Sequence, residues 1–157
     1  MAGQYLYSAN LTKIAAGTAS ATQYGVWCLD PVTNPVTVVE FGFGLDGSSA
    51  AQSFQVSLVT QSAGNSGTIS PLAWPDQRAP SATTTVTGNG TSAVGTTTGT
   101  LCSWAVQPFG GQIDIQYPLM REPGAAAAAT TARIGLAYTN PGSTVVNLTS
   151  YVVWSEG

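Results

Sequence analysis

The strongest constraint on the fold is an alternation of large apolar side chains with small or polar ones at a period of two residues. From Val38 to Leu45, the large side chains at positions 39, 41, 43 and 45 alternate with Glu40 and glycine, and the run ends at the turn-forming pair Asp46-Gly47. Phe54 to Leu58 repeats the pattern. Because successive strand side chains point to opposite faces, both runs predict half-buried strands. We expect an antiparallel connection between them across residues Asp46 to Gln52.

Other short runs are rich in β-branched and aromatic residues, and breakers containing glycine, proline or asparagine separate them. A weaker pattern from Tyr5 to Ala16 indicates an N-terminal arm or an edge strand, and Ala125 to Ala129 is expected to be a loop because so short a helix is marginal in water. About eight strands in 157 residues predict one all-β domain, a sandwich or a barrel. The further strands are expected at Tyr24–Leu29, Leu101–Val106, Ile113–Tyr117, Ile134–Tyr138 and Val145–Trp154.

The segment from Ala79 to Thr100 contains no charged residue and is rich in threonine and glycine, so little of it is expected in the core. It fits either a mobile surface loop or a hairpin that turns near Gly88-Asn89-Gly90. We favour the hairpin, because threonine suits the pleated surface of a sheet.

The side chains that most enzymes use are scarce. Only eleven of the 157 residues are Asp, Glu, Lys or Arg, which is 7% against about 25% in an average soluble protein, and there is no histidine. A hydrolytic triad or a zinc site would normally need histidine, so neither a metal nor a cofactor is expected. Gly42-Phe43-Gly44 lies inside a strand pattern, where glycine indicates a bulge or a close backbone approach rather than a phosphate loop.

One pair of carboxyl groups is a candidate enzyme site. Glycoside cleavage without a metal needs two carboxyl groups that face each other across a cleft. Asp114 and Glu122 are the only nearby pair with aromatic residues, Trp104 and Tyr117, in their neighbourhood. The simpler interpretation places Asp114 on the outer face of its strand and assigns Arg121 and Glu122 to a turn. We therefore expect a protein without catalytic activity.

Charge and hydropathy also narrow the partners and the location. A net charge of −3 gives no basic surface for nucleic acid. Glu40 interrupts the longest apolar stretch, Pro35 to Leu45, so no membrane span is expected, and Met1 to Leu11 lacks the features of a secretory signal. The chain is therefore expected to be made and kept in a cytoplasm. Cys28 and Cys102 lack metal-ligand spacing and are expected to be small buried hydrophobic residues.

The tryptophans divide into two groups. Trp27, Trp104 and Trp154 fall within predicted strands and are expected in the core or at its rim. Trp74 lies in a segment bracketed by prolines, where it either plugs the end of the sandwich or anchors a partner. We favour the plug.

Four blocks of sequence, taken together and in order, resemble the small β-sandwich proteins that decorate tailed-phage capsids, also called head-stabilising or cement proteins. The likeness extends from about Val26 to Gly157, while the segment 79–100 and the alanine run Ala125 to Ala129 depart from it. The blocks are Val39-Glu-Phe-Gly-Phe-Gly-Leu-Asp-Gly47, Phe54-Gln-Val-Ser-Leu-Val59, Gly110-Gly-Gln-Ile-Asp-Ile-Gln-Tyr-Pro-Leu-Met-Arg-Glu122 and Tyr151-Val-Val-Trp-Ser-Glu156.

The resemblance implies a jelly-roll-like antiparallel sandwich that assembles as a homotrimer on the outside of an icosahedral shell and binds the major capsid protein. Its location would be the virion. A trimer can attach durably through individually weak contacts, and binding only the assembled shell stabilises that shell. The alternative is a receptor- or carbohydrate-binding module of a head or tail fibre, with an exposed aromatic such as Trp74 stacking on a sugar.

Candidate interface residues come from three places in the sequence. They are aromatic, cationic or flexible apolar side chains in loops, beside the Gly110-Gly111 strand, or in the N-terminal segment. The candidates are Tyr5, Tyr7, Trp74, Arg78, Tyr117, Met120 and Arg121.

Overall fold

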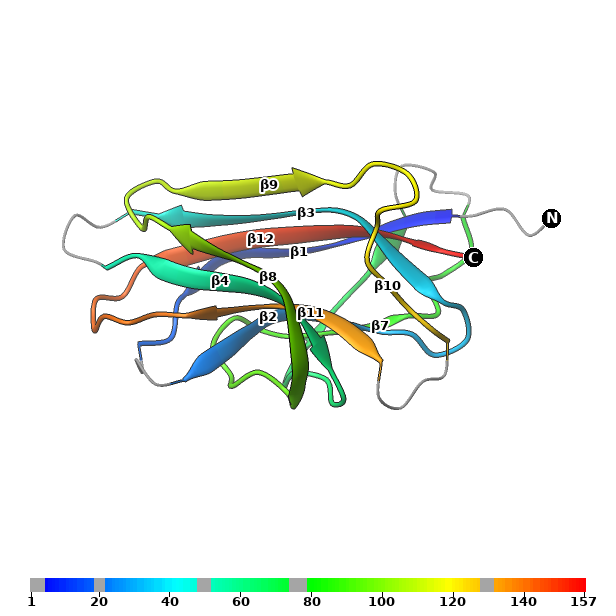
Figure 1. Ribbon diagram of the computed structural model, residues 1–157, viewed down its shortest axis with the longest axis horizontal. Helices are drawn as coiled ribbons and strands as arrows, with labels where there is room; N and C mark the ends of the chain where they lie inside the picture. The colour runs from blue at the N-terminus through cyan, green and yellow to red at the C-terminus, as the bar shows by residue number, and fades with distance from the viewer. Residues whose placement is uncertain (1–4, 19–21, 48–51, 74–78, 128–131) are drawn as a thin grey trace.

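The computed structural model describes residues 5–18, 22–47, 52–73, 79–127 and 132–157, and within them the chain forms strands and no helix. The strands make two antiparallel sheets packed face to face (Figure 1). Sheet A has the order β10 (Gly124–Ala125), β3 (Val36–Asp46), β12 (Asn147–Glu156), β1 (Tyr5–Ala15) and β6 (Leu72–Ala73), with β9 (Gln112–Gln116) also paired to β3. Sheet B has the order β5 (Thr68–Ile69), β7 (Thr85–Thr87), β2 (Gln23–Asp30), β11 (Arg133–Thr139), β4 (Phe54–Gln61) and β8 (Thr97–Val106).

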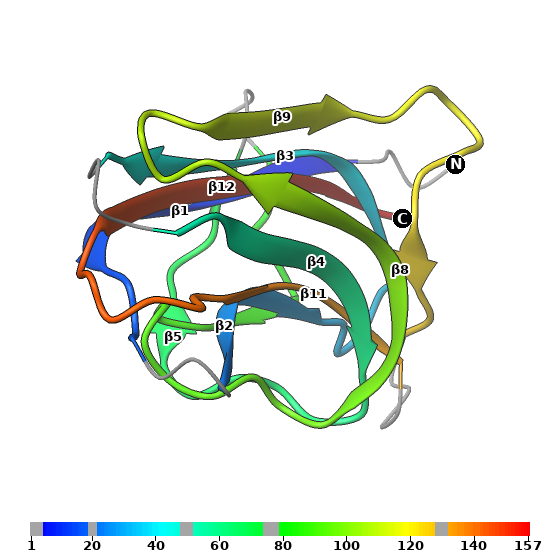
Figure 2. The same cartoon turned by 60° about the vertical axis from the view of Figure 1, so that its left-hand side comes forward.

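The strand connections are those of a jelly roll. Four antiparallel pairs nest from the outside of the sequence inward: β1 with β12, β2 with β11, β3 with β9, and β4 with β8. Successive pairs alternate between sheet A and sheet B, which is the wrapping of a jelly-roll sandwich (Figure 2). The expected fold class, an all-β jelly-roll-like sandwich with about eight principal strands, is confirmed.

The core lies between the two sheets and is dominated by aromatic rings. The Phe41 ring centroid lies 5.8 Å from that of Trp27 and 5.8 Å from that of Trp104. The Tyr138 ring lies 5.9 Å from Phe43 and 5.5 Å from Phe54. Trp27 and Trp154 are fully buried and Trp104 is half-buried against the core, so these three tryptophans lie in the core or at its rim, as expected.

The N-terminal segment is a strand of sheet A rather than a free arm. Only Tyr7 and Ser8 pair with β6 on the side away from β12, so most of β1 lies at the edge of the described sheet. β1 is one strand between β12 and β6, and Tyr5 to Leu11 pair in register with Glu156 to Ser150. Its inner positions are filled by Tyr7, Ala9 and Leu11, all buried. The alternation of apolar and polar residues is weak in this part of the sequence. Leu6, at an outer position, is apolar, and Ala9, at an inner position, is small.

The strands β3 and β4 do not pair with each other, contrary to the connection expected across Asp46 to Gln52. They belong to opposite sheets, and each presents its apolar face to the same core. Alternation identifies a strand with one buried face but does not identify its neighbour. Residues 48–51 of the connection lie outside the described part of the chain.

The threonine-rich segment 79–100 does not form the expected hairpin. β7 pairs with β2 and β5, whereas β8 pairs with β4 at the opposite edge of sheet B. Val86 is fully buried, so the segment also contributes to the core. Gly88 and Gly90 have positive φ angles of 142° and 71°, and an added Cβ at Gly88 would lie 2.2 Å from the backbone oxygen of Val26. The glycines thus allow close approach to β2 rather than a two-residue turn.

The outer face of sheet B is covered by the chain itself. The connections from β4 to β5 and from β7 to β8 must both cross the sheet, because they join strands near opposite edges. The interior residues of β2 and β11 are buried on both faces as a result. Gly25 makes room for this cover, because an added Cβ would lie 2.3 Å from the side chain of Asn65. Gly135 makes room for the side chain of Gln61 at the end of β4, which would lie 2.0 Å from an added Cβ.

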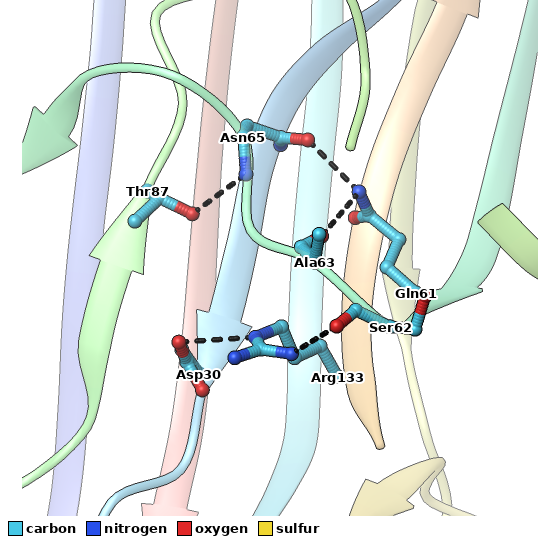
Figure 3. A network of polar contacts seen from close by, with 7 residues as sticks. All are labelled: Asp30, Gln61, Ser62, Ala63, Asn65, Thr87 and Arg133. Atoms are coloured by element: carbon cyan, nitrogen blue, oxygen red, sulfur yellow. Dashed lines mark hydrogen bonds and ion pairs between the residues drawn. The ribbon is translucent and has the colours of Figure 1, made fainter. Parts of the chain in front are cut away.

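A polar network fixes the cover to the sheet (Figure 3). The Asn65 side-chain oxygen accepts hydrogen bonds from Gln61 Nε2 and from the backbone nitrogen of Gly95, both at 2.9 Å. The Arg133 guanidinium lies 3.0 Å from an Asp30 carboxylate oxygen and donates to the backbone oxygen of Ser62 at 2.6 Å. Because these groups are buried or half-buried and hydrogen-bonded to one another, we interpret the network as structural.

Candidate functional site

The outer face of sheet A, in contrast, carries a groove formed by three rows of directly paired residues. The middle row runs Asn10, Tyr151, Gly42 and Asp114 across β1, β12, β3 and β9. On one side of it lies the row Ser8, Val153, Glu40 and Gln116, and on the other the row Thr149, Gly44 and Gln112. We call these three rows, with the adjoining Lys13 and Asp46, the sheet A groove.

Three hollows follow one another along the sheet A groove and share lining residues. One of about 250 Å³ lies beside Glu40 and shares Asn10 and Tyr151 with the next, of about 170 Å³. That hollow shares Gly44, Gln112 and Thr149 with a third, of about 400 Å³, which reaches Lys13 and Asp46. Glu40 and Asp46 are six residues apart on β3, so the groove is roughly 20 Å long.

Tyr151 stands in the middle of the groove because Gly42 has no side chain. An added Cβ at Gly42 would lie 2.3 Å from the Tyr151 ring and 2.5 Å from an Asp114 carboxylate oxygen. The Tyr151 hydroxyl donates to Asp114 Oδ1 at 3.3 Å, and Gln112 Nε2 donates to Asp114 Oδ2. Partial burial raises the pKa of Tyr151, and the nearby carboxylates of Asp114 and Glu40 raise it further. The sequence predicts a bulge or a close backbone approach at this glycine, whereas the structure shows the close approach of two side chains.

The groove contains a large share of the few charges that the structure describes. Lys13, Glu40, Asp46 and Asp114 line it and give a formal charge of one minus three, or −2. Asp30 and Arg133 pair with each other at the cover of sheet B, and Glu156 is buried. The arrangement therefore favours neutral or cationic ligands over anionic ones.

A second surface feature lies in the connection between β9 and β10. The side chains of Leu119 and Met120 are 88% and 98% exposed, the highest values among the large apolar residues described. Met120 has a φ of 68°, a left-handed conformation that is uncommon for a residue with a side chain. We call Leu119 and Met120 the apolar tip. They border a hollow of about 640 Å³ that Leu6 and Val39 also line.

The structure separates the interface residues predicted from the sequence. Met120 belongs to the apolar tip, and Arg121 follows it as an exposed residue. Tyr117 lines the hollow beside the tip, but its ring centroid lies 6.2 Å from that of Phe41 at the core, and burial raises the pKa of Tyr117 to about 12. Only the first two of these three offer a largely free side chain.

The remaining predicted residues lie elsewhere. Tyr5 is 40% exposed and lines a separate hollow with Pro80. Tyr7 is only 2% exposed, stacks on Trp154 with ring centroids 5.9 Å apart, and donates its hydroxyl to the backbone oxygen of Pro80. It therefore has no side-chain surface to offer a partner. Trp74 and Arg78 lie outside the described residues.

The two carboxyl groups of the candidate enzyme site, Asp114 and Glu122, do not line the same hollow. Asp114 lines the sheet A groove, whereas Glu122 lines the hollow beside the apolar tip. Trp104 and Tyr117 pack against the core, and the aromatic neighbour of Asp114 is Tyr151. Within the described residues, no three side chains of the metal-ligating types gather at one place.

Both cysteines are free thiols. Cys28 is fully buried, as expected, and burial raises its pKa to about 12, which makes its thiolate scarce. Cys102 is half-buried. In the part of the chain that the structure covers, no helix has the length and apolar character needed to cross a membrane.

Sequence reasoning missed the sheet A groove, because its residues come from four strands that are far apart in the sequence. The available signals were two glycines inside a strand pattern and a tyrosine at an outward-facing position of the last strand. The chain was compared with known proteins. No family model matches it, and no curated protein matches it.

Proposed function

We propose that this protein is a structural component of a tailed-phage virion that binds the outer surface of the capsid as a homotrimer and stabilises the assembled shell. It would be made in the host cytoplasm and act without a cofactor. The major capsid protein is the proposed partner.

The apolar tip is the observation that carries the proposal. Exposing two large apolar side chains on a connection between strands is unfavourable in water unless a partner covers them. The tip borders a hollow, so a partner surface could pack against both a projection and a cavity, as hot spots of protein interfaces do. The low charge of the surface also suits an interface, whose core is usually depleted of charged residues.

Two further considerations support a shell as the partner. The sequence blocks that resemble decoration proteins include the β9 strand and the apolar tip itself, from Gly110 to Glu122. Jelly rolls are common in viral capsid domains, although this is an analogy of fold and not of site. A trimer would engage three copies of the capsid protein at once, so modest contacts at each tip would sum to durable attachment.

Co-sedimentation tests the proposal. Purified protein at micromolar concentration is mixed with expanded, empty capsids that lack it, and the pellet is analysed. We expect the protein in the pellet, and we expect Leu119→Ser/Met120→Ser to weaken binding by about tenfold or more, since hot-spot truncations typically have effects of this size.

The matched control is Val145→Ser, which removes an exposed apolar side chain from the connection between β11 and β12. It should bind like the unmodified protein. Unmodified protein that stays in the supernatant would count against shell binding, and equal binding by both variants would count against the apolar tip as the contact.

A further inference from the structure

We propose that the sheet A groove is a binding site for a neutral oligosaccharide, with Tyr151 and Asp114 at its centre. This inference is independent of capsid attachment, which we assign to the apolar tip. It gives the molecule a second recognition surface at the middle of sheet A.

The polar groups of the groove match the hydrogen-bonding character of sugars. A sugar hydroxyl both donates and accepts, and the middle row offers a carboxylate that only accepts together with an amide that does both. Asp114 accepts one bond from Gln112 and one from Tyr151, whereas a carboxylate has about four acceptor positions. Asn10 and Gln112 are exposed, so their amides are available to a ligand.

Tyr151 supplies the apolar component that sugar recognition also needs. The ring is half-buried and lines two adjacent hollows, so sugar units on either side could pack their C–H faces against it. An aromatic side chain over a strand glycine also stabilises a sheet without any ligand. That role does not account for the row of hollows, or for the concentration of charged and amide groups along them.

Other classes of ligand fit the groove less well. Its formal charge of −2 disfavours nucleic acids and acidic peptides. An extended peptide would need free backbone groups, but β12 lies between β1 and β3 and its backbone is paired on both sides. A length of roughly 20 Å suits a short chain of sugar units better than a single compact molecule.

The test uses isothermal titration calorimetry with neutral tetrasaccharides of glucose, galactose and N-acetylglucosamine, and with the corresponding monosaccharides. We expect one tetrasaccharide to bind, and to bind more tightly than its monosaccharide because the hollows act in series. Asp114→Asn and Asn10→Ala should each weaken binding by about tenfold or more, as loss of a charge-assisted or an amide hydrogen bond would. Glu122→Gln, which removes a carboxylate outside the groove, should not change it.

The outcomes separate this inference from the proposed function. Asp114→Asn should still co-sediment with capsids, and Leu119→Ser/Met120→Ser should still bind the tetrasaccharide. Failure of all three tetrasaccharides to bind at millimolar concentration would overturn the saccharide site and leave capsid attachment untouched. Binding that survives both groove substitutions, or binding of pentalysine in place of the sugars, would overturn it equally.

Discussion

At the scale of single residues, Glu156 shows how one buried carboxylate can hold two parts of the chain together. It is 4% exposed, and its oxygens accept hydrogen bonds from the backbone nitrogens of Thr83 and Thr84, the Thr83 hydroxyl and Trp154 Nε1, at 2.7 to 3.2 Å. Burial alone would raise the pKa of Glu156, but the hydrogen bonds from Thr83 and Thr84 outweigh it and leave the pKa below its usual 4.5. The carboxylate thereby fastens β12 to the threonine-rich segment.

This arrangement predicts a specific dependence of stability on pH. Because the folded-state pKa is lowered, the contribution of Glu156 is fully present above its usual pKa of 4.5 and is lost as the pH falls through the folded-state value. Glu156→Gln should lower the free energy of unfolding by about 1–3 kcal/mol at neutral pH, since it leaves buried donors without a good acceptor.

Urea denaturation across the acidic range measures this effect. The difference between Glu156→Gln and the unmodified protein should shrink as the pH drops below the folded-state pKa, while Glu122→Gln should follow the unmodified protein throughout. A Glu156→Gln difference that is constant with pH would show that the carboxylate does not titrate as described.

At the scale of the elements, the threonine-rich segment depends on a close backbone approach at Gly88. Its φ of 142° and the 2.2 Å separation between an added Cβ and the Val26 oxygen leave no room for a side chain. Gly110 offers a comparison, because it has a φ of 70° but nothing within 4 Å of an added Cβ.

Gly88→Ala should therefore destabilise the fold more than Gly110→Ala. Gly110→Ala should lower the free energy of unfolding by only about 1–2 kcal/mol, the cost of a left-handed backbone conformation for a residue with a side chain. Gly88→Ala should in addition displace β7 from β2. Urea denaturation gives the two losses, and amide hydrogen exchange in β7 and β2 reports the displacement. Equal losses with unchanged exchange would contradict the close packing described here.

The elements also show which features of this molecule are readable from its sequence. Strands such as β3 and β4 were predictable, because alternation requires only that one face be buried. Their partners were not, because pairing depends on residues far apart in the sequence. One feature of the sequence indicates that the outer face of sheet B is covered. Tyr24 to Leu29 is nearly continuous in apolar residues, which is typical of a strand buried on both faces.

At the scale of the whole molecule, the outer faces of the two sheets differ in what covers them. Sheet B is closed by its own connections and by the network around Asn65, while sheet A exposes a polar groove and borders the apolar tip. We propose that the apolar tip attaches the protein to a shell and that the sheet A groove remains free to bind an oligosaccharide. Separate substitutions should therefore weaken capsid binding and saccharide binding independently.

Electron microscopy of expanded capsids incubated with the purified protein would show directly whether the protein attaches to the shell through the apolar tip. We expect additional density on the outer surface at or near the threefold positions, with three jelly rolls in each unit and the Leu119–Met120 connection against the capsid protein. Bare shells at saturating protein concentration would rule out attachment to the capsid, and bound protein with Leu119 and Met120 facing solvent would rule out the apolar tip as the contact.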